Sequence, residues 1–112
     1  MKLTNKQKLS KTIRWLRKEF PGPVSVYTKQ VKLPIVGKMQ ILGDTERKAA
    51  CFIIRLHKPS EYRVKMDTIL HEWAHVLTWF DCKYEDHPNV WGEKYAGIYR
   101  SWLKWNIGRK EK

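Results

Sequence analysis

The sequence has few cysteines, few acidic side chains and no long apolar run. Its two cysteines, Cys51 and Cys82, are too few for a disulfide framework and are typical of a reduced, cytoplasmic protein. No apolar stretch approaches the roughly 20 residues that span a bilayer, so we expect no membrane partner. The first twenty residues are too charged for a signal peptide.

The shortage of acidic residues leaves a net charge of +12, which is unevenly distributed. The first twenty residues carry +6 and the last twelve carry +3, whereas residues 71–100 carry −2. A strong positive field favours a polyanion, so DNA is a candidate partner; a basic surface that only keeps the protein soluble is the alternative. The candidate phosphate contacts are Arg14, Arg17 and Lys18, supported by Lys6, Lys8 and Lys11 and by a tail with Arg109, Lys110 and Lys112.

Apolar spacing predicts a single α+β domain over residues 1–112. An amphipathic helix is expected over 5–20, with Thr4 or Asn5 as its cap and Pro21 as its stop. Residues 24–57 predict a small antiparallel sheet. The first strand is expected to begin at Val24 and to continue to Val31 and Leu33, and Pro34 and Gly37 mark a turn. A short second strand covers Met39 to Leu42 and is ended by Gly43-Asp44, and a third covers Ala49 to Leu56.

Two further helices are expected in the second half of the chain. One runs from about Pro59-Ser60 to Phe80, where apolar residues recur at helical spacing. The other runs from about Asn89 to Trp105. A basic tail over 106–112 follows, and it is expected to fray after Gly108.

The chemistry is concentrated in the segment His71-Glu72-Trp73-Ala74-His75. Residues four apart lie on one face of a helix, so both imidazoles can bind one metal ion while the helix stays regular. Glu72 is rotated away from the ligand direction and can act on a water at the metal as general base. Two solvated surface histidines are the plain alternative, but the apolar neighbours of the motif indicate burial, and buried histidines need partners.

A catalytic zinc site needs a third protein ligand and an open position. His87, in the loop that follows the site helix, and Glu93, one turn into the next helix, are both candidates. We favour His87, because a Glu93 ligand leaves the loop histidine unexplained. His57 is expected to be a satisfied surface histidine.

The motif Leu70-His71-Glu72-Trp73-Ala74-His75, followed by His87-Pro88-Asn89-Val90-Trp91-Gly92, resembles the SprT-like metallopeptidases, the family of the Spartan DNA–protein crosslink proteases. The similarity covers about residues 38–105. It implies a zincin-like, minimal stand-alone catalytic core with His71, His75 and His87 as zinc ligands and Glu72 as general base. Pro88 stands where that family usually has glycine, and the chain has no zinc-ribbon module.

These features predict a zinc-dependent metallopeptidase that hydrolyses peptide bonds, with DNA-associated proteins as one substrate class. The transition-state oxyanion could be held by Tyr84, Tyr95 or Tyr99, each of which is more readily explained by packing, and Trp91 is expected to pack under the metal. Three alternatives stay open: a peptidase with Glu93 as third ligand, a non-catalytic basic nucleic-acid-binding zinc module, and a peptidase that cleaves one host protein.

Overall fold

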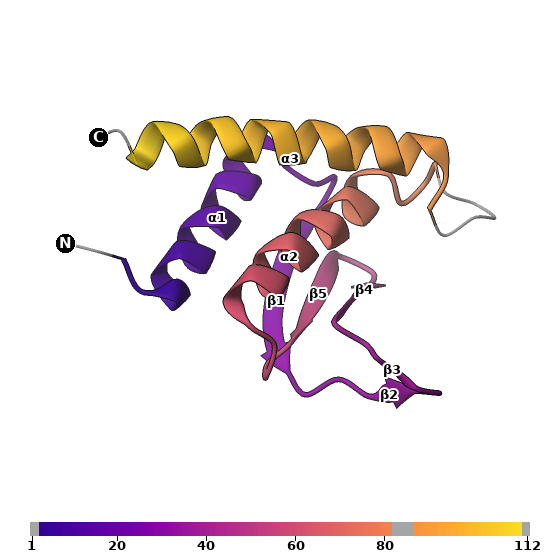
Figure 1. The fold of residues 1–112 in the computed structure, drawn as a ribbon. Coiled ribbons are helices and arrows are strands. Elements are labelled where there is room, and N and C mark those ends of the chain that lie inside the picture. The colour runs from indigo at the N-terminus through magenta and orange to yellow at the C-terminus, as the bar shows by residue number, and fades with distance from the viewer. Residues whose placement is uncertain (1–2, 82–86, 111–112) are drawn as a thin grey trace.

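The structure is a computed structural model that describes residues 3–81 and 87–110, with side chains as far as Asn106. Helices and strands are mixed along the chain, so the predicted α+β class is confirmed (Figure 1). The elements are α1 (Asn5–Glu19), β1 (Ser25–Val31), β2 (Ile35–Val36), β3 (Met39–Gln40), β4 (Gly43–Arg47), β5 (Cys51–His57), α2 (Tyr62–Leu77) and α3 (Asn89–Lys110).

The start of α1 follows the local sequence rules closely. Thr4 is the N-cap, and its hydroxyl accepts a hydrogen bond from the backbone N–H of Gln7, whose side chain in turn accepts one from the backbone N–H of Thr4. This reciprocal capping box satisfies two backbone donors that the first helical turn leaves without helical partners. The helix ends before Pro21 and buries Leu9 and Leu16 toward the core.

The sheet is mixed, so the antiparallel sheet expected from the sequence is wrong. Its strand order is β1-β5-β4: β5 pairs parallel with β1 and antiparallel with β4. Strand β4 begins at Gly43, where a strand was expected to end, and Met39–Gln40 pairs instead with Ile35–Val36 in a separate hairpin. Local alternation identifies strands, but pairing depends on contacts made far along the chain.

Helix α2 covers one face of this sheet (Figure 1). Strand β5 alternates between buried and half-buried residues, and its buried side chains, Phe52, Ile54 and Leu56, belong to the same core cluster as those of α2. Trp73 is fully buried, and its Nε1–H donates a 2.7 Å hydrogen bond to the carbonyl of Phe20. The polar atom of this large core residue is thereby satisfied at the end of α1.

Helix α3 runs along one side of the molecule, past the ends of α1 and α2 (Figure 1). It buries Ile98 against the core, and Trp105 stacks on Trp15 of α1 at a ring-centroid distance of 5.2 Å. The helix continues to Lys110, so the basic tail expected over 106–112 is helical for most of its length. No helix in the described ranges combines the length and apolar character needed to cross a membrane.

Candidate metal centre

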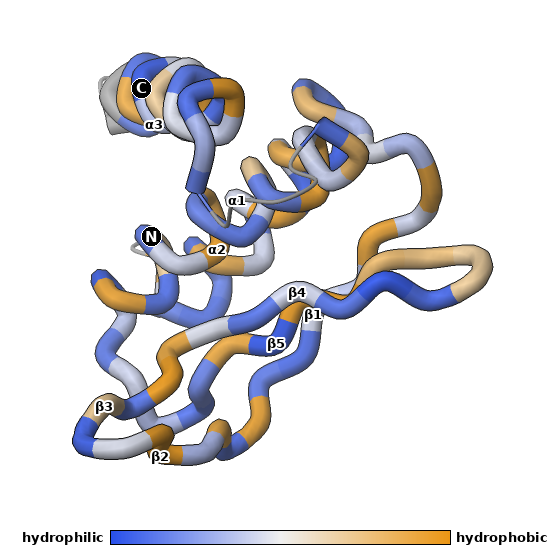
Figure 2. Tube along the Cα trace, turned by 90° about the vertical axis from the view of Figure 1, so that its right-hand side faces the viewer, coloured by the Kyte–Doolittle hydropathy of each residue, from blue (hydrophilic) through white to orange (hydrophobic). Residues whose placement is uncertain are grey.

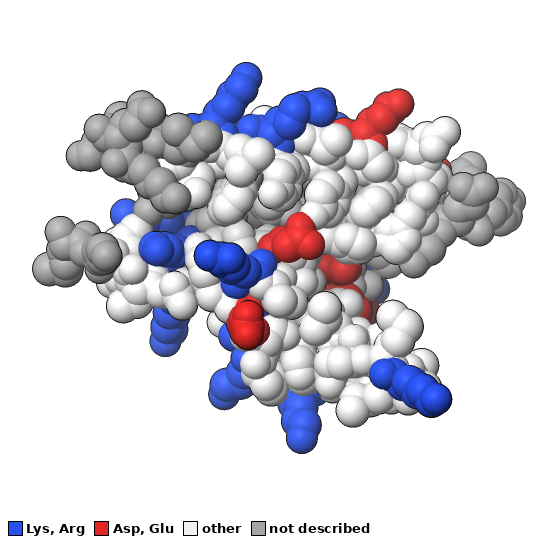
Figure 3. Space-filling view, viewed as in Figure 1, with Lys and Arg blue, Asp and Glu red and all other residues white. Residues whose placement is uncertain are grey.

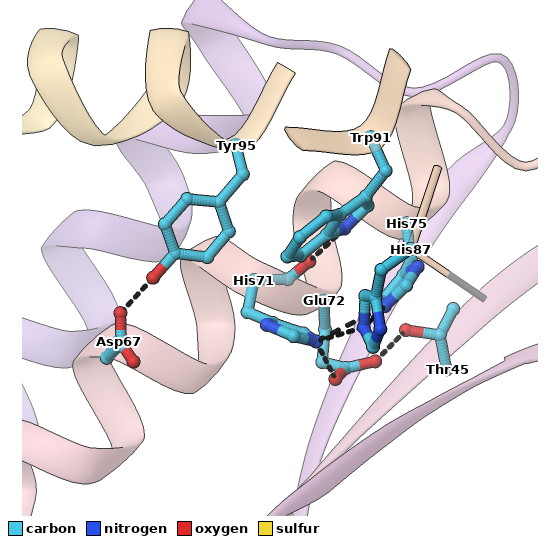
Figure 4. A network of polar contacts seen from close by, with 8 residues as sticks. All are labelled: Thr45, Asp67, His71, Glu72, His75, His87, Trp91 and Tyr95. Atoms are coloured by element: carbon cyan, nitrogen blue, oxygen red, sulfur yellow. Dashed lines mark hydrogen bonds and ion pairs between the residues drawn. The ribbon is translucent and has the colours of Figure 1, made fainter. Parts of the chain in front are cut away.

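Helix α2 brings His71 and His75 together as the sequence predicted. They lie one turn apart, and their Nε2 atoms are 3.2 Å from each other (Figure 4). The α-helix is continuous through this turn. Ile69, Leu70, Trp73 and Ala74 are fully buried, and their packing fixes the orientation of the turn against the core. Packing of α2 therefore decides which way the histidines point.

His87 reaches the same point from the segment that precedes α3. Its Nε2 atom lies 3.2 Å from Nε2 of His75 and 3.2 Å from Nε2 of His71. Glu93 is exposed and does not belong to this group, so the geometry favours His87 over Glu93 as the third ligand. Elsewhere in the described ranges, no three His, Cys, Asp or Glu side chains converge in this way.

The triangle of imidazole nitrogens fits a zinc ion. Zinc–nitrogen bonds of about 2.0–2.1 Å at a tetrahedral angle place two ligand nitrogens about 3.3–3.4 Å apart. The three observed separations of 3.2 Å lie close to that spacing. Three protein donors would leave one position of a tetrahedral ion open, which is the arrangement of catalytic rather than structural zinc sites.

Trp91, in the first turn of α3, packs against all three histidines, as the sequence predicted. Its ring stacks on His75 at a centroid distance of 5.2 Å and meets His71 and His87 edge-on at 4.7 and 4.4 Å. Its Nε1–H donates a 3.3 Å hydrogen bond to the backbone carbonyl of His71. One side chain thus ties α3 to α2 at the centre of the site.

Glu72 is buried beside the triangle and has one oxygen turned toward it. Its Oε2 atom lies 3.7 Å from Nε2 of His71, too far for both atoms to share a hydrogen bond. Its Oε1 atom accepts a 2.7 Å hydrogen bond from the hydroxyl of Thr45 on β4. The carboxylate therefore borders the donor set and is oriented from the neighbouring strand.

Thr45 and Gly43 are the site residues that the sequence analysis missed. A Cβ atom at Gly43 would lie 2.4 Å from Cγ2 of Thr68, so only glycine lets β4 approach α2 this closely. The Gly43-Asp44 pair reads locally as a turn, and nothing in its neighbourhood indicates a strand beside the metal motif.

Tyr95 is held in a second layer of contacts around His71. Its ring lies edge-on to the His71 ring at 5.8 Å, and its hydroxyl donates a hydrogen bond to Oδ1 of Asp67. Burial, and then this bond, raise the pKa of Tyr95 above its usual range. Its hydroxyl is thus engaged with Asp67 and not directed at the histidines. Tyr99 stacks on Tyr95, and Tyr84 lies outside the described residues.

The candidate nucleic-acid contacts lie on α1. Arg14 and Lys18 are exposed, and Figure 3 shows basic side chains on this side of the molecule. Arg17 is exposed as well, but its guanidinium donates hydrogen bonds to the carbonyl of Val26 through Nε and Nη2, at 3.3 and 3.0 Å. It fastens α1 to β1 and has fewer donors left for a phosphate. The side chains of Arg109, Lys110 and Lys112 fall outside the described part of the chain.

His57 corrects a further expectation. It is buried, not on the surface, and its Nδ1 accepts a 3.0 Å hydrogen bond from the backbone N–H of Leu33. It stays apart from the group formed by the other three histidines and serves to anchor the chain after β1.

Comparison of the chain with protein-family models, with curated proteins and with solved structures found no match. The resemblance to the SprT-like metallopeptidases therefore depends on the residues of the motif alone.

Proposed function

We propose that this chain is a zinc-dependent metallopeptidase of the SprT-like type. One observation carries the proposal: the Nε2 atoms of His71, His75 and His87 form a triangle with 3.2 Å sides, and the carboxylate of Glu72 lies beside it. Three protein ligands favour a catalytic zinc over a closed structural one, which speaks against a non-catalytic zinc module.

His71, His75 and His87 would hold the metal, each as a neutral imidazole that presents Nε2. Zinc in such a site lowers the pKa of a water molecule and polarises a carbonyl group. Glu72 accepts the proton of the attacking water and delivers it to the nitrogen of the departing amine. Thr45 keeps the carboxylate oriented for both transfers, and burial of Glu72 keeps bulk water away from it.

The edge strand β4 offers a place for the substrate. One edge of β4 pairs with β5, and no strand among the described residues pairs with the other. An extended peptide can join such an edge through main-chain hydrogen bonds. Because Thr45 lies in this strand, a peptide bound there passes close to Glu72 and the histidines. This geometry favours an unfolded polypeptide as substrate.

DNA remains a second proposed partner, supported by the charge of +12 and by the exposed Arg14 and Lys18. Binding should be insensitive to sequence and should weaken with salt, with a slope of about −0.9 per neutralised phosphate on a log–log plot for duplex DNA. The double variant Arg14→Glu with Lys18→Glu should abolish DNA binding. If the wild-type protein does not bind DNA at low salt, its positive charge serves only to keep the protein soluble. A cytoplasmic location is part of the proposal, in keeping with the low cysteine content.

The proposal is tested by reconstitution with metal. Protein stripped with a chelator is incubated with an unfolded protein, with and without one equivalent of zinc, and new chain ends are detected by mass spectrometry. We expect cleavage only in the zinc-loaded sample, and no cleavage by a His71→Ala variant given the same zinc. Equal cleavage with and without zinc, or none in any sample, would contradict the proposal.

A further inference from the structure

The hairpin formed by β2 and β3 carries large apolar side chains into solvent. Val36 lies opposite Met39 in the register, so their side chains share one face, and they are 62% and 73% exposed. Gly37, with φ of +63°, makes the two-residue turn between them. Clustered apolar exposure of this kind is a feature of binding surfaces.

The base of the hairpin is firmly held. The side-chain amide nitrogen of Gln40 lies 2.9, 3.1 and 2.9 Å from the carbonyl oxygens of Leu33, Pro34 and Ile41, and its two N–H groups are shared among these three acceptors. The bond from the backbone N–H of Leu33 to His57 ties the same base to the end of β5. These bonds hold the apolar tip in one conformation, which reduces the conformational entropy lost when a partner binds to it.

The hairpin is continuous with the edge strand that borders the metal centre. From Met39 the chain passes through the exposed Leu42 directly into β4, and β4 lies at the open edge of the sheet (Figure 2). At the far end of β4, the guanidinium of Arg47 lies 4.7 Å from the ring centroid of Phe80, which is 60% exposed. Exposed apolar groups therefore stand at both ends of the free edge.

The charge around the hairpin selects the kind of partner. Residues 24–43 contain Lys29, Lys32 and Lys38 and no acidic residue. The two acidic residues that follow on β4 are engaged in ion pairs, Asp44 with Arg55 and Glu46 with Lys48 and Arg55. In Figure 3 the surface over β2 and β3 is largely uncharged, with basic side chains beside it. A second copy of the chain fits poorly, because two chains of charge +12 repel each other and a few tip residues offer far less than the roughly 800 Å² per partner of a stable interface.

We propose that the β2–β3 hairpin is a docking element for unfolded polypeptide segments in which apolar residues alternate with acidic ones. Val36 and Met39 contact the apolar side chains, Lys32 and Lys38 attract the acidic ones, and the segment continues along β4. That this docking delivers substrate to the histidines rests on the proposed peptidase function. The binding itself does not require hydrolysis.

The test uses zinc-loaded protein with Glu72→Gln, which removes cleavage from the measurement. Fluorescence anisotropy measures the Kd of labelled peptides of about 20 residues, enough to span β4 and the hairpin at about 3.3 Å per residue. One peptide combines Leu, Val and Phe with Asp and Glu; a second has Ser at the apolar positions; a third has Lys at the acidic ones. We expect the first to bind most tightly. Val36→Ser with Met39→Ser should weaken its binding at least tenfold, because both apolar contacts of the hairpin tip are lost.

The matched control is Tyr27→Ser on β1, the opposite edge of the sheet, where the tyrosine is 55% exposed. It should leave the Kd within about twofold, which is under about 0.5 kcal/mol. Should the double variant fail to fold, Lys32→Glu with Lys38→Glu tests the same surface and should abolish the preference for the acidic peptide.

Equal affinity of the hairpin variant and its parent, or no peptide binding by the parent, would overturn the inference. The inference would also be overturned if the hairpin substitutions weakened binding to phosphatidylglycerol vesicles but not to peptides, because the tip would then be a lipid-binding element. Cleavage by the wild type without hairpin-dependent binding would leave the peptidase proposal intact and reject this one. Hairpin-dependent binding by a chain that cleaves nothing would support the docking element and reject the peptidase proposal.

Discussion

Thr45 and Glu72 are 27 residues apart in the sequence and are joined by a 2.7 Å hydrogen bond. The hydroxyl of Thr45 holds Oε1 of Glu72, while Oε2 faces Nε2 of His71 at 3.7 Å. The bond connects the edge strand β4 to α2, the helix that carries His71 and His75. It orients a carboxylate that borders the three histidines.

Replacing Thr45 by valine removes this bond and nearly preserves the shape of the side chain. A hydrogen bond to a charged group contributes about 1.5–3 kcal/mol, so we expect kcat to fall about 10- to 100-fold. KM and zinc content should change little, because Thr45 does not belong to the histidine group. Thr45→Ser keeps a hydroxyl and should recover most of the activity. An unchanged kcat in the valine variant would show that Glu72 is oriented by other contacts.

Gly43→Ala tests the close approach of β4 to α2. The added Cβ would meet Cγ2 of Thr68 at 2.4 Å and the carbonyl of Arg55 at 3.1 Å. We expect a loss of about 1–3 kcal/mol in the free energy of unfolding, measured by denaturant titration. Thr68→Ser removes the clashing methyl group and should recover part of the loss in the double variant.

The control for Gly43→Ala is Gly97→Ala in α3. A Cβ atom at Gly97 would meet no atom within 4 Å, and alanine favours a helix by up to about 1 kcal/mol over glycine. This control should be neutral or stabilising. A loss at Gly43 no larger than the change at Gly97 would mean that β4 adapts without strain.

Trp91→Ala should weaken zinc binding without unfolding the chain. Trp91 packs on all three histidine rings and donates to the carbonyl of His71. Loss of the partners that orient metal ligands costs about 10- to 100-fold in affinity, which competition with a zinc-binding dye measures. Trp102→Ala removes a tryptophan whose indole donates to Thr12, away from the site. It should lower stability and leave zinc affinity unchanged; equal zinc affinities in both variants would contradict the role of Trp91.

Paired variants of His87 and Glu93 decide the third ligand. His87→Ala removes one of three converging nitrogens and should lower zinc affinity by several orders of magnitude, whereas Glu93→Ala should leave it unchanged. Zinc should raise the Tm of the wild type, because an ion that binds only the folded state stabilises it. The same rise in Tm in the His87→Ala protein, with none in the Glu93→Ala protein, would reverse the assignment.

The sequence predicted the parts of the site that depend on local periodicity. Helix α2 was expected to run from about Pro59 to Phe80 and is observed over Tyr62–Leu77, because apolar residues at helical spacing specify both the helix and its buried face. The same spacing placed His71 and His75 side by side. Trp91, four residues after His87, was also correctly expected to pack under the histidines.

The parts that the sequence did not predict depend on contacts between distant segments. Gly43-Asp44 has the composition of a turn, yet it begins a strand because β5 offers a pairing edge and α2 leaves room only for glycine. The parallel pairing of β1 with β5 joins segments more than twenty residues apart, and no local pattern distinguishes it from antiparallel pairing. The contact from Thr45 to Glu72 follows from that sheet order and could not be expected before it was known.

We infer that Glu72 acts as general base while His71, His75 and His87 hold the metal. Mass spectrometry of a defined unfolded peptide, incubated with zinc-loaded wild type and with zinc-loaded Glu72→Gln, tests it most directly. We expect both proteins to hold one zinc per chain and the variant to cleave the peptide about 10³-fold more slowly or worse, the range expected on loss of a general base. A Glu72→Gln protein that keeps its zinc and cleaves at the wild-type rate would contradict the account.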